Sequence, residues 1–293
     1  MKKAIGIEEQ LSRLKLKVEV EDEPITRFML TNIGYYRLRC YLHHFIDKDQ
    51  STGKNKVYTN GTSLSQAIAL YYFDYDLRML LIRFLTNIEL SIRTRIINVM
   101  SVKYGPLWYI DSNVMSKAYI EKFIGGGYGD VLSRNRTLKK SKKKGKRLPD
   151  TEFHAAWKIV EYMTLWEIVK LYENIKEVKN KEIISKEFHI KSPKVFKSYV
   201  ETIRCLRNTC AHGDVLYDLS LAQKIANGPA STTIDDANRS SLFEAIKVVV
   251  YFLEQISDEY KEEFTDKLHK IYADAGALSN VLNMTIKGDL SII

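Results

Sequence analysis

Apolar residues recur every three or four positions along most of the chain, which is the spacing of one face of an α-helix. The longest such run begins near Ser63 and reaches about Val102. It is followed by Lys103-Tyr104-Gly105-Pro106, a sequence typical of a helix stop. We therefore expect one long helix here. Its buried stripe would consist of Phe73, Leu77, Leu80, Leu81, Phe84, Leu85, Ile88 and Ile92.

Shorter segments with the same period predict further helices on both sides of the long one. Ser192-Pro193 resembles an N-cap and first-turn pair, and we expect it to open a helix that ends near Gly213. Its buried stripe would contain Phe196, Tyr199, Val200, Ile203, Leu206 and Cys210. The other expected helices are residues 7–20, 26–45 (one helix or a pair around Gly34), 112–123, 151–179 with Trp157 on its apolar side, 181–188, and 241–268 as one or two helices.

Polar and glycine-rich stretches separate these helices. Residues 47–62 and 220–240 have the composition of loops, and the glycines of 125–129 are typical of a hinge. The prediction is an all-α fold, a helical bundle with an N-terminal helical extension and a basic loop insertion. The expected divisions are an N-terminal segment 1–62, a helical domain 63–275 with a flexible basic insertion 125–148, and a C-terminal tail 276–293.

Composition adds a preference for polyanionic partners. The chain has 293 residues, of which 45% are apolar, and a formal net charge of +9. A basic excess of this size favours nucleic acid. Three cysteines without a CxxC pair predict a reducing compartment, and no apolar segment is long enough for a signal peptide or a membrane span. We expect a soluble, cytoplasmic protein without a membrane partner.

Much of the positive charge lies in one stretch, residues 134–147, which no acidic residue interrupts. One interpretation is a solvated, disordered loop, the usual meaning of a block of like charges. The other, which we favour, is a segment that positions RNA through salt-dependent contacts with phosphates. Base stacking is not indicated within the stretch, because it contains no aromatic residue. The nine candidate RNA-binding residues are Arg134, Arg136, Lys139, Lys140, Lys142, Lys143, Lys144, Lys146 and Arg147.

The candidate chemistry lies at the end of the Pro193 helix, in Arg207-Asn208-Thr209-Cys210-Ala211-His212. A guanidinium binds phosphate through a planar fork, and an imidazole transfers protons near neutral pH. Together they suit phosphodiester chemistry. Arg207 and His212 are five residues apart, so one regular helix does not bring them together. Either the helix ends near Ala211 or the two residues meet across a dimer axis.

Structural roles compete for the same residues. A histidine at a helix C-terminus favours the helix dipole and binds the last carbonyls. Arg204 and Arg207 suit ion pairs with acids such as Glu161 or Glu201, and Glu89 with Arg93 has the spacing of an intrahelical pair. The adjacent histidines at 43–44 cannot both ligate one ion from a regular helix, and we expect neither a metal site nor a cofactor.

Several segments in order resemble the abortive-infection (Abi) protein family of the AbiD/AbiF type, within the HEPN superfamily. The resemblance covers about residues 25–220. The chain departs from the family pattern at Gly213-Asp214, where relatives often carry a second histidine, a basic residue or an amide. It also departs near Trp166, where a glycine is common. The segments that carry the resemblance are Ile33 to Leu38, Phe73 to Arg78, Ile88 to Arg95, Trp157, Glu161, Trp166, Leu171 to Asn174, Leu206 to His212, and Leu216-Tyr217.

This resemblance implies a four-helix core and a composite site formed by two copies. It also implies metal-independent cleavage in which the ribose 2′-OH attacks its own phosphate. His212 would then act as general acid or base, Arg207 would stabilise the phosphorane, and Asn208 would hold a phosphate oxygen or orient the histidine. Arg204 and Glu161 would support them, Glu161 as an acid that orients the motif or as part of a plain ion pair.

The predicted function is therefore an anti-phage defence protein that binds RNA and cleaves it as a homodimer. The alternative is a non-catalytic module that holds a small structured RNA, which the basic excess fits equally well. A further alternative is an interaction protein whose motif is only a dimer contact. The expected partner is RNA, which could be cellular RNA, phage RNA or a small non-coding RNA.

Overall fold

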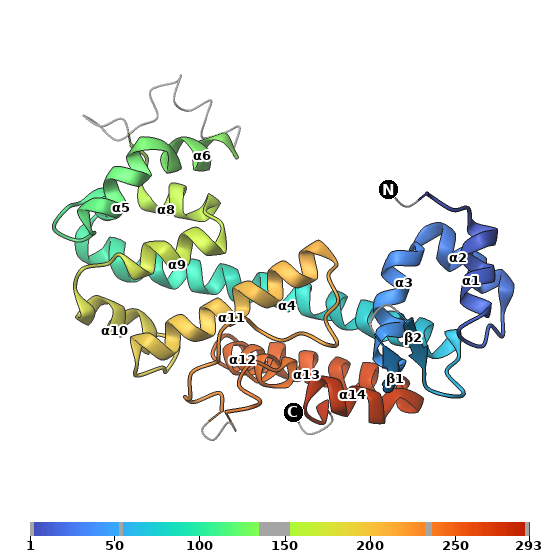
Figure 1. Cartoon of the computed structure of the whole chain (residues 1–293). Helices are drawn as coiled ribbons and strands as arrows, with labels where there is room; N and C mark the ends of the chain where they lie inside the picture. Colours follow the sequence, from blue (N-terminus) through green and yellow to red (C-terminus); the bar gives the residue numbers. More distant parts are fainter. Residues whose placement is uncertain (1–2, 53–54, 135–152, 232–235, 291–292) are drawn as a thin grey trace.

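One long helix, α4 (Leu64–Tyr104), crosses the molecule and contacts elements from both halves of the chain (Figure 1). The computed structural model describes residues 3–52, 55–134, 153–231, 236–290 and 293. Ser63 opens α4 as its N-cap, and its N–H donates to Gln66 Oε1 at 3.1 Å. Gly105 closes the helix at φ 78°, which a glycine adopts without strain. The predicted stripe is buried throughout, so the all-α prediction is confirmed in its main element.

The N-terminal elements lie around one end of α4 (Figure 1). Gly34, at φ 90°, breaks the predicted 26–45 segment into two helices. Residues 47–62 were expected as a loop, and this expectation is wrong for part of the range, because Ile46 pairs with Tyr58 in an antiparallel hairpin. The elements are α1 (Ile7–Lys15), α2 (Glu23–Asn32), α3 (Tyr35–Leu42), a 3₁₀ turn (His43–Phe45), β1 (Ile46–Thr52) and β2 (Asn55–Tyr58).

The opposite end of α4 is covered by a small helical group (Figure 1). The glycines expected as a hinge instead form a π-helical turn, η3 (Phe123–Gly127), within an unbroken helical run that ends at Ser133. The helical run thus continues past residue 125, where the flexible insertion was expected to begin. The flanking elements are a 3₁₀ turn (Trp108–Ile110), α5 (Lys117–Lys122) and α6 (Tyr128–Ser133).

The single helix expected over 151–179 is also divided. Met163 is extended (ψ 143°), and Thr164 caps a new helix with Glu167 in a capping box. This local signal outweighs the continuous apolar period. Trp157, which the period placed on the buried side, is 49% exposed. The resulting elements are α8 (Ala156–Ile159), the 3₁₀ turn η4 (Val160–Tyr162) and α9 (Leu165–Glu173).

The helices of the C-terminal half pack along the length of α4. The range 276–293 was expected as a tail, but it contains a helix, and Leu282, Ile286 and Leu290 in it are buried. None of the helices described is long and apolar enough to cross a bilayer. The elements are α10 (Val178–Lys186), α11 (Pro193–His212), α12 (Leu242–Glu254), α13 (Asp258–Asp274), a 3₁₀ turn (Gly276–Leu278) and α14 (Ser279–Ile286).

Candidate functional site

Helix α11 carries the candidate motif and lies across the middle of α4, with its C-terminal end directed toward α3 (Figure 1). Pro193 is in its first turn and Gly213 closes it in the left-handed conformation, as predicted. The N–H of Gly213 donates to the carbonyl of Cys210 at 3.2 Å, and that of Asp214 to the carbonyl of Thr209 at 3.0 Å. These two bonds form a Schellman motif, which ends the helix immediately after His212.

The regular helix places Arg207 and His212 on different sides. Five residues correspond to a rotation of about 140° around the axis. His212 is exposed, and the Arg207 side chain is 41% exposed. The helix ends at His212, close to the expected Ala211 and with Gly213 as its C-cap, and this ending does not bring the two side chains together. Arg204 and Asn208 precede His212 at intervals of four, so these three residues share one face.

Arg207 does not project freely into solvent. Its Nε lies 3.4 Å from Glu89 Oε2 on α4, and its Nη1 is 3.5 Å from Asn208 Oδ1. Glu89 also binds Arg93 Nη2 at 2.7 Å, and the same nitrogen donates to the carbonyl of Met163 at 2.8 Å. A chain of contacts therefore joins the motif arginine, through two residues of α4, to the backbone before α9.

The acid beside Arg207 is Glu89 and not one of the two acids that sequence suggested. Glu201 pairs with Arg204, whose Nε lies 2.6 Å from Glu201 Oε2. Glu161 is half-buried in the turn η4, and among the described residues no hydrogen bond or ion pair joins it to Arg207 or His212. The Glu89–Arg93 pair is present as predicted. The i, i+4 spacing does not reveal that Glu89 has a further partner, Arg207 on α11.

The backbone immediately after His212 is held by two arginines from other helices. Arg37 of α3 donates to the carbonyl of Gly213, and Arg78 of α4 donates to the carbonyl of Asp214 at 3.2 Å. Together with the Schellman bonds, these contacts leave the end of α11 little freedom to move. The imidazole of His212 is thus exposed on a restrained support.

A buried carboxylate, Asp74, completes this anchor. Its Oδ1 accepts from the N–H of Leu216 at 3.0 Å and of Tyr217 at 2.6 Å, while Oδ2 binds Arg78 and the Tyr41 hydroxyl. Asp74 is fully buried and the Arg78 side chain is 7% exposed. Burial raises the pKa of the Asp74 carboxyl, and these four donors oppose the rise.

Arg37, Asp74 and Arg78 lie in segments that carry the family resemblance, but no role was expected for them. The available signal was the charged pair Asp74–Arg78 inside an apolar stretch of helix, between Phe73 and Leu81. Charges that face a core are retained only when they are paired and hydrogen-bonded. That rule indicates a buried partner without saying which segment supplies it.

Other chemistry near the motif is limited. Burial raises the pKa of the Cys210 thiol to about 12, so this cysteine remains protonated at neutral pH and is a poor nucleophile. Among the described residues no group of three or more histidine, cysteine or acidic side chains is arranged to hold a metal ion.

Most of the predicted RNA-binding segment lies outside the described residues, and its first member, Arg134, lies at the end of α6. Arg134 Nη1 is 2.5 Å from Glu167 Oε2, and its Nη2 is 3.0 Å from Glu167 Oε1. Arg134 also donates to the carbonyl of Tyr162 at 3.3 Å. The segment therefore starts beside the capping box of α9. Its other members, outside the description, are Arg136, Lys139, Lys140, Lys142, Lys143, Lys144, Lys146 and Arg147.

A family model described as "Abi-like protein" matches residues 28–218 of the chain. The match includes α3, α4 and α11, and with them the anchor residues from Arg37 to Tyr217 and the whole Arg207–His212 motif. No curated protein and no solved structure matches the chain.

Proposed function

The chain belongs to the Abi-like protein family, which suggests abortive-infection defence, and on this premise we propose that it is a metal-independent endoribonuclease. The proposal concerns the end of α11. There, an exposed imidazole and a half-exposed guanidinium stand on one helix within a basic protein of net charge +9. Their partner would be RNA, whose phosphates supply the complementary charge.

The observation that carries the proposal is the anchoring of His212. A general acid or base must be open to substrate and yet positioned to within a fraction of an ångström. The His212 ring is exposed, while Arg37, Arg78 and Asp74 hold the backbone that follows it. A histidine that only terminates a helix has no need of such support from two other helices.

The reaction assigned to the site is an internal transfer within RNA. One imidazole removes the proton of a ribose 2′-OH, whose oxygen forms a new bond to the adjacent phosphorus. The bond to the 5′-oxygen breaks, and the proton that the imidazole took up returns, through a water molecule, to that leaving oxygen. Arg207 binds the phosphate oxygens, where negative charge increases in the transition state. The products are a 2′,3′-cyclic phosphate end and a 5′-hydroxyl end.

Two copies of the chain would supply the arginine and the imidazole of each site. Within one helix, Arg207 and His212 point in directions about 140° apart, so a single chain presents them to different places. A twofold axis beside the end of α11 would bring Arg207 of one copy to His212 of the other. Homodimer formation therefore accompanies the proposed activity.

The test is cleavage of labelled cellular RNA by purified protein in excess EDTA, with the ends of the products identified chemically. We expect cyclic phosphate ends from wild type, and a loss of at least about a hundredfold in rate for His212→Ala and Arg207→Ala. The matched controls are His189→Asn, an exposed histidine that precedes the other end of α11, and Arg83→Ala, an arginine 55% exposed on α4.

The controls separate chemistry from loss of charge. Cleavage that is unchanged in His212→Ala would refute the assignment. RNA that is bound with equal affinity by wild type, His212→Ala and Arg207→Ala, without cleavage by any of them, would favour the alternative of a non-catalytic RNA-binding module.

A further inference from the structure

A second feature of the molecule, remote in sequence from the motif, is a pocket beside the half-exposed indole of Trp166 on α9. The Trp166 side chain is 47% exposed. Tyr119 and Phe123 line the same pocket from α5 and η3, and the lining is mostly apolar. Its volume of about 300 Å³ is at the lower end of the range for small-ligand sites. An indole left open to solvent next to two other rings has the composition of a stacking surface.

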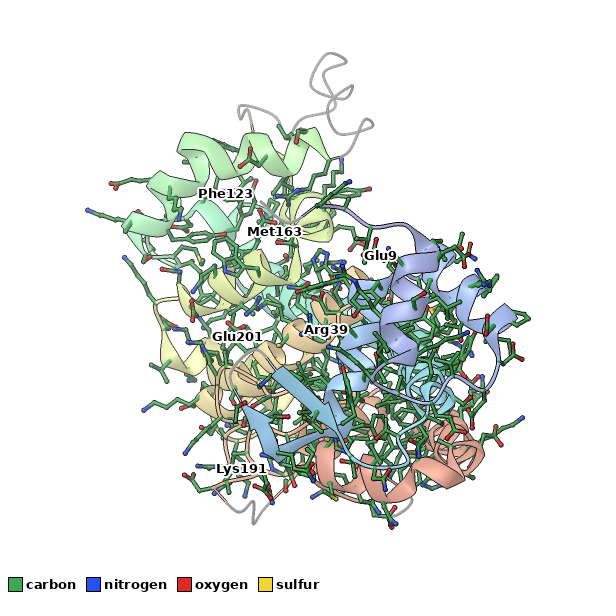
Figure 2. The ribbon with its side chains drawn as sticks, turned by 45° about the vertical axis from the view of Figure 1, so that its right-hand side comes forward. Glu9, Arg39, Phe123, Met163, Lys191 and Glu201 are labelled. Carbon is green, nitrogen blue, oxygen red and sulfur yellow. The ribbon has the colours of Figure 1, made fainter. Side chains whose placement is uncertain are left out.

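The glycine-rich π-helical turn forms part of the pocket wall. Gly127 lines the pocket, and a Cβ at this position would lie 3.1 Å from the Phe123 ring. The absence of a side chain at Gly127 therefore lets the Phe123 ring pack closely, and a Cβ there would require the ring to shift by a few tenths of an ångström. π-helical turns inside α-helices are frequent at functional sites. Figure 2 shows Phe123 in the same part of the molecule as Met163, which directly precedes the helix cap of α9.

Two lysines stand beside the apolar lining, and one of them, Lys170, lies 2.7 Å from Glu173 Oε2. Lys122 and Lys170 both line the pocket, and Lys170 Nζ lies 5.9 Å from the centroid of the Trp166 ring. Glu167 lines it as well, but Arg134 binds both oxygens of that carboxylate. The pocket therefore combines aromatic rings with cations, and it begins beside the residue that opens the basic segment 134–147.

The backbone before α9 connects this pocket to the motif on α11. Arg134, from the pocket side, donates to the carbonyl of Tyr162. Arg93 donates to the carbonyl of Met163, the next residue, and binds Glu89, which contacts Arg207. The carbonyls of two adjacent residues are thus bonded by Arg134 and Arg93, and this chain of contacts runs from Glu167 at the pocket to Arg207 of the motif.

We propose that this pocket binds one unpaired base of single-stranded RNA by stacking it on Trp166, with Lys122 and Lys170 binding the adjoining phosphates. The inference rests on the proposed function, since it requires that the protein bind RNA. It deepens that function by naming the substrate class: RNA with an unpaired nucleotide at a set distance from the cleaved bond. Aromatic platforms flanked by cations bind single strands with little sequence preference.

The experiment measures the affinity of fluorescein-labelled 12-nucleotide RNA for full-length protein that carries His212→Ala, so that the probe stays intact. Trp166→Ala is compared with Trp157→Ala, a tryptophan of nearly equal exposure (49%) on α8. We expect Trp166→Ala to weaken binding by about ten- to a hundredfold, the loss of one stacked base, and Trp157→Ala to change it by less than about twofold. Trp166→Phe, which keeps a ring, should recover most of the affinity.

A second readout uses the indole itself, in case Trp166→Ala folds poorly. In a Trp157→Phe protein the emitting residues are Trp166 and the buried Trp108. RNA should quench this emission, and an RNA of equal charge with abasic sites should not.

Equal affinity in Trp166→Ala and Trp157→Ala, or no quenching while RNA is bound, would overturn the base-binding role of the pocket and leave the proposed function standing. Failure of wild type to bind any RNA would overturn both. Quenching by a peptide and not by RNA would assign the pocket to a protein partner.

Discussion

Helix α4 carries two carboxylate–arginine pairs of the same i, i+4 spacing, and they have different roles. Asp74–Arg78 is almost completely buried, and every oxygen of Asp74 has a protein donor. Glu89–Arg93 lies about 22 Å further along the axis, with each side chain about a tenth exposed. There, Glu89 Oε2 faces Arg207, and Arg93 Nε has no hydrogen-bond partner among the described residues.

The difference shows that the partners supplied by other segments decide what a charged pair does. The Asp74 pair is saturated by the backbone after α11 and serves as a support. The Glu89 pair contacts a half-exposed arginine that a phosphate can also bind, so its bonds can be exchanged for substrate. One pair restrains the end of the motif helix, and the other touches the motif itself.

Asp74→Asn should have the largest effect of the substitutions that test these two roles. The substitution leaves Arg78 charged, buried and without its carboxylate, which costs about 3–5 kcal/mol of unfolding free energy. Urea denaturation followed by circular dichroism measures the loss. The control, Glu9→Gln, breaks a pair of the same spacing whose side chains are more than half exposed, and should cost less than about 1 kcal/mol. A cost below 1 kcal/mol for Asp74→Asn would contradict the role of this pair as the support of α11.

Glu89→Gln tests the second pair and should have a smaller effect on stability. It removes one charged hydrogen bond to Arg93, worth about 1–3 kcal/mol, and frees Arg207 from a competing carboxylate. We therefore expect RNA that is made uncleavable by a 2′-deoxyribose at the cleaved bond to bind Glu89→Gln about two- to fivefold more tightly than wild type. The comparison protein is Glu263→Gln, which removes the same charge at a pair with Arg83. Weaker RNA binding in Glu89→Gln alone would show that Glu89 holds Arg207 in its binding position.

A third pair, Arg134–Glu167, extends the comparison to the surface and should show the smallest effect. Burial raises the pKa of Glu167, but hydrogen bonds from Arg134 and Thr164 outweigh it and leave the pKa below the usual 4.5. The stabilisation is therefore present above pH 4.5 and is lost as the pH falls through the lower folded value. Arg134→Gln should reduce stability at pH 7 by less than about 1 kcal/mol. The difference from wild type should vanish near pH 2; a constant difference from pH 7 to 2 would mean that the carboxylate is not involved.

Local signals in the sequence predicted the elements whose ends they mark. Ser63 and Gly105 bound α4, and Pro193 and Gly213 bound α11, because capping depends on residues close in the chain. The hairpin after α3 was missed, since strand pairing needs a partner that a polar composition does not reveal. Periodicity also failed at Thr164, where a capping box starts a new helix within an apolar period that continues through it.

The motif residues were identifiable from sequence, but their contacts were not. Arg207 and Glu89 lie more than a hundred residues apart, and no local pattern indicates that they meet. Trp166 was noted only as a departure from the family, because its exposure depends on how α9 packs against α5 and η3. Residue types thus gave the candidate chemistry, and tertiary contacts separate the supports from the residues open to substrate.

The central claim is that Arg207 and His212 form one site across two copies of the chain, and co-expression of Arg207→Ala and His212→Ala subunits with different tags tests it most directly. Each variant alone should fail to cleave RNA in EDTA. The purified heterodimer should regain about half of the wild-type rate, since one of its two sites then combines an intact Arg207 with an intact His212. A heterodimer as inactive as either parent, beside an active wild type, would contradict the claim.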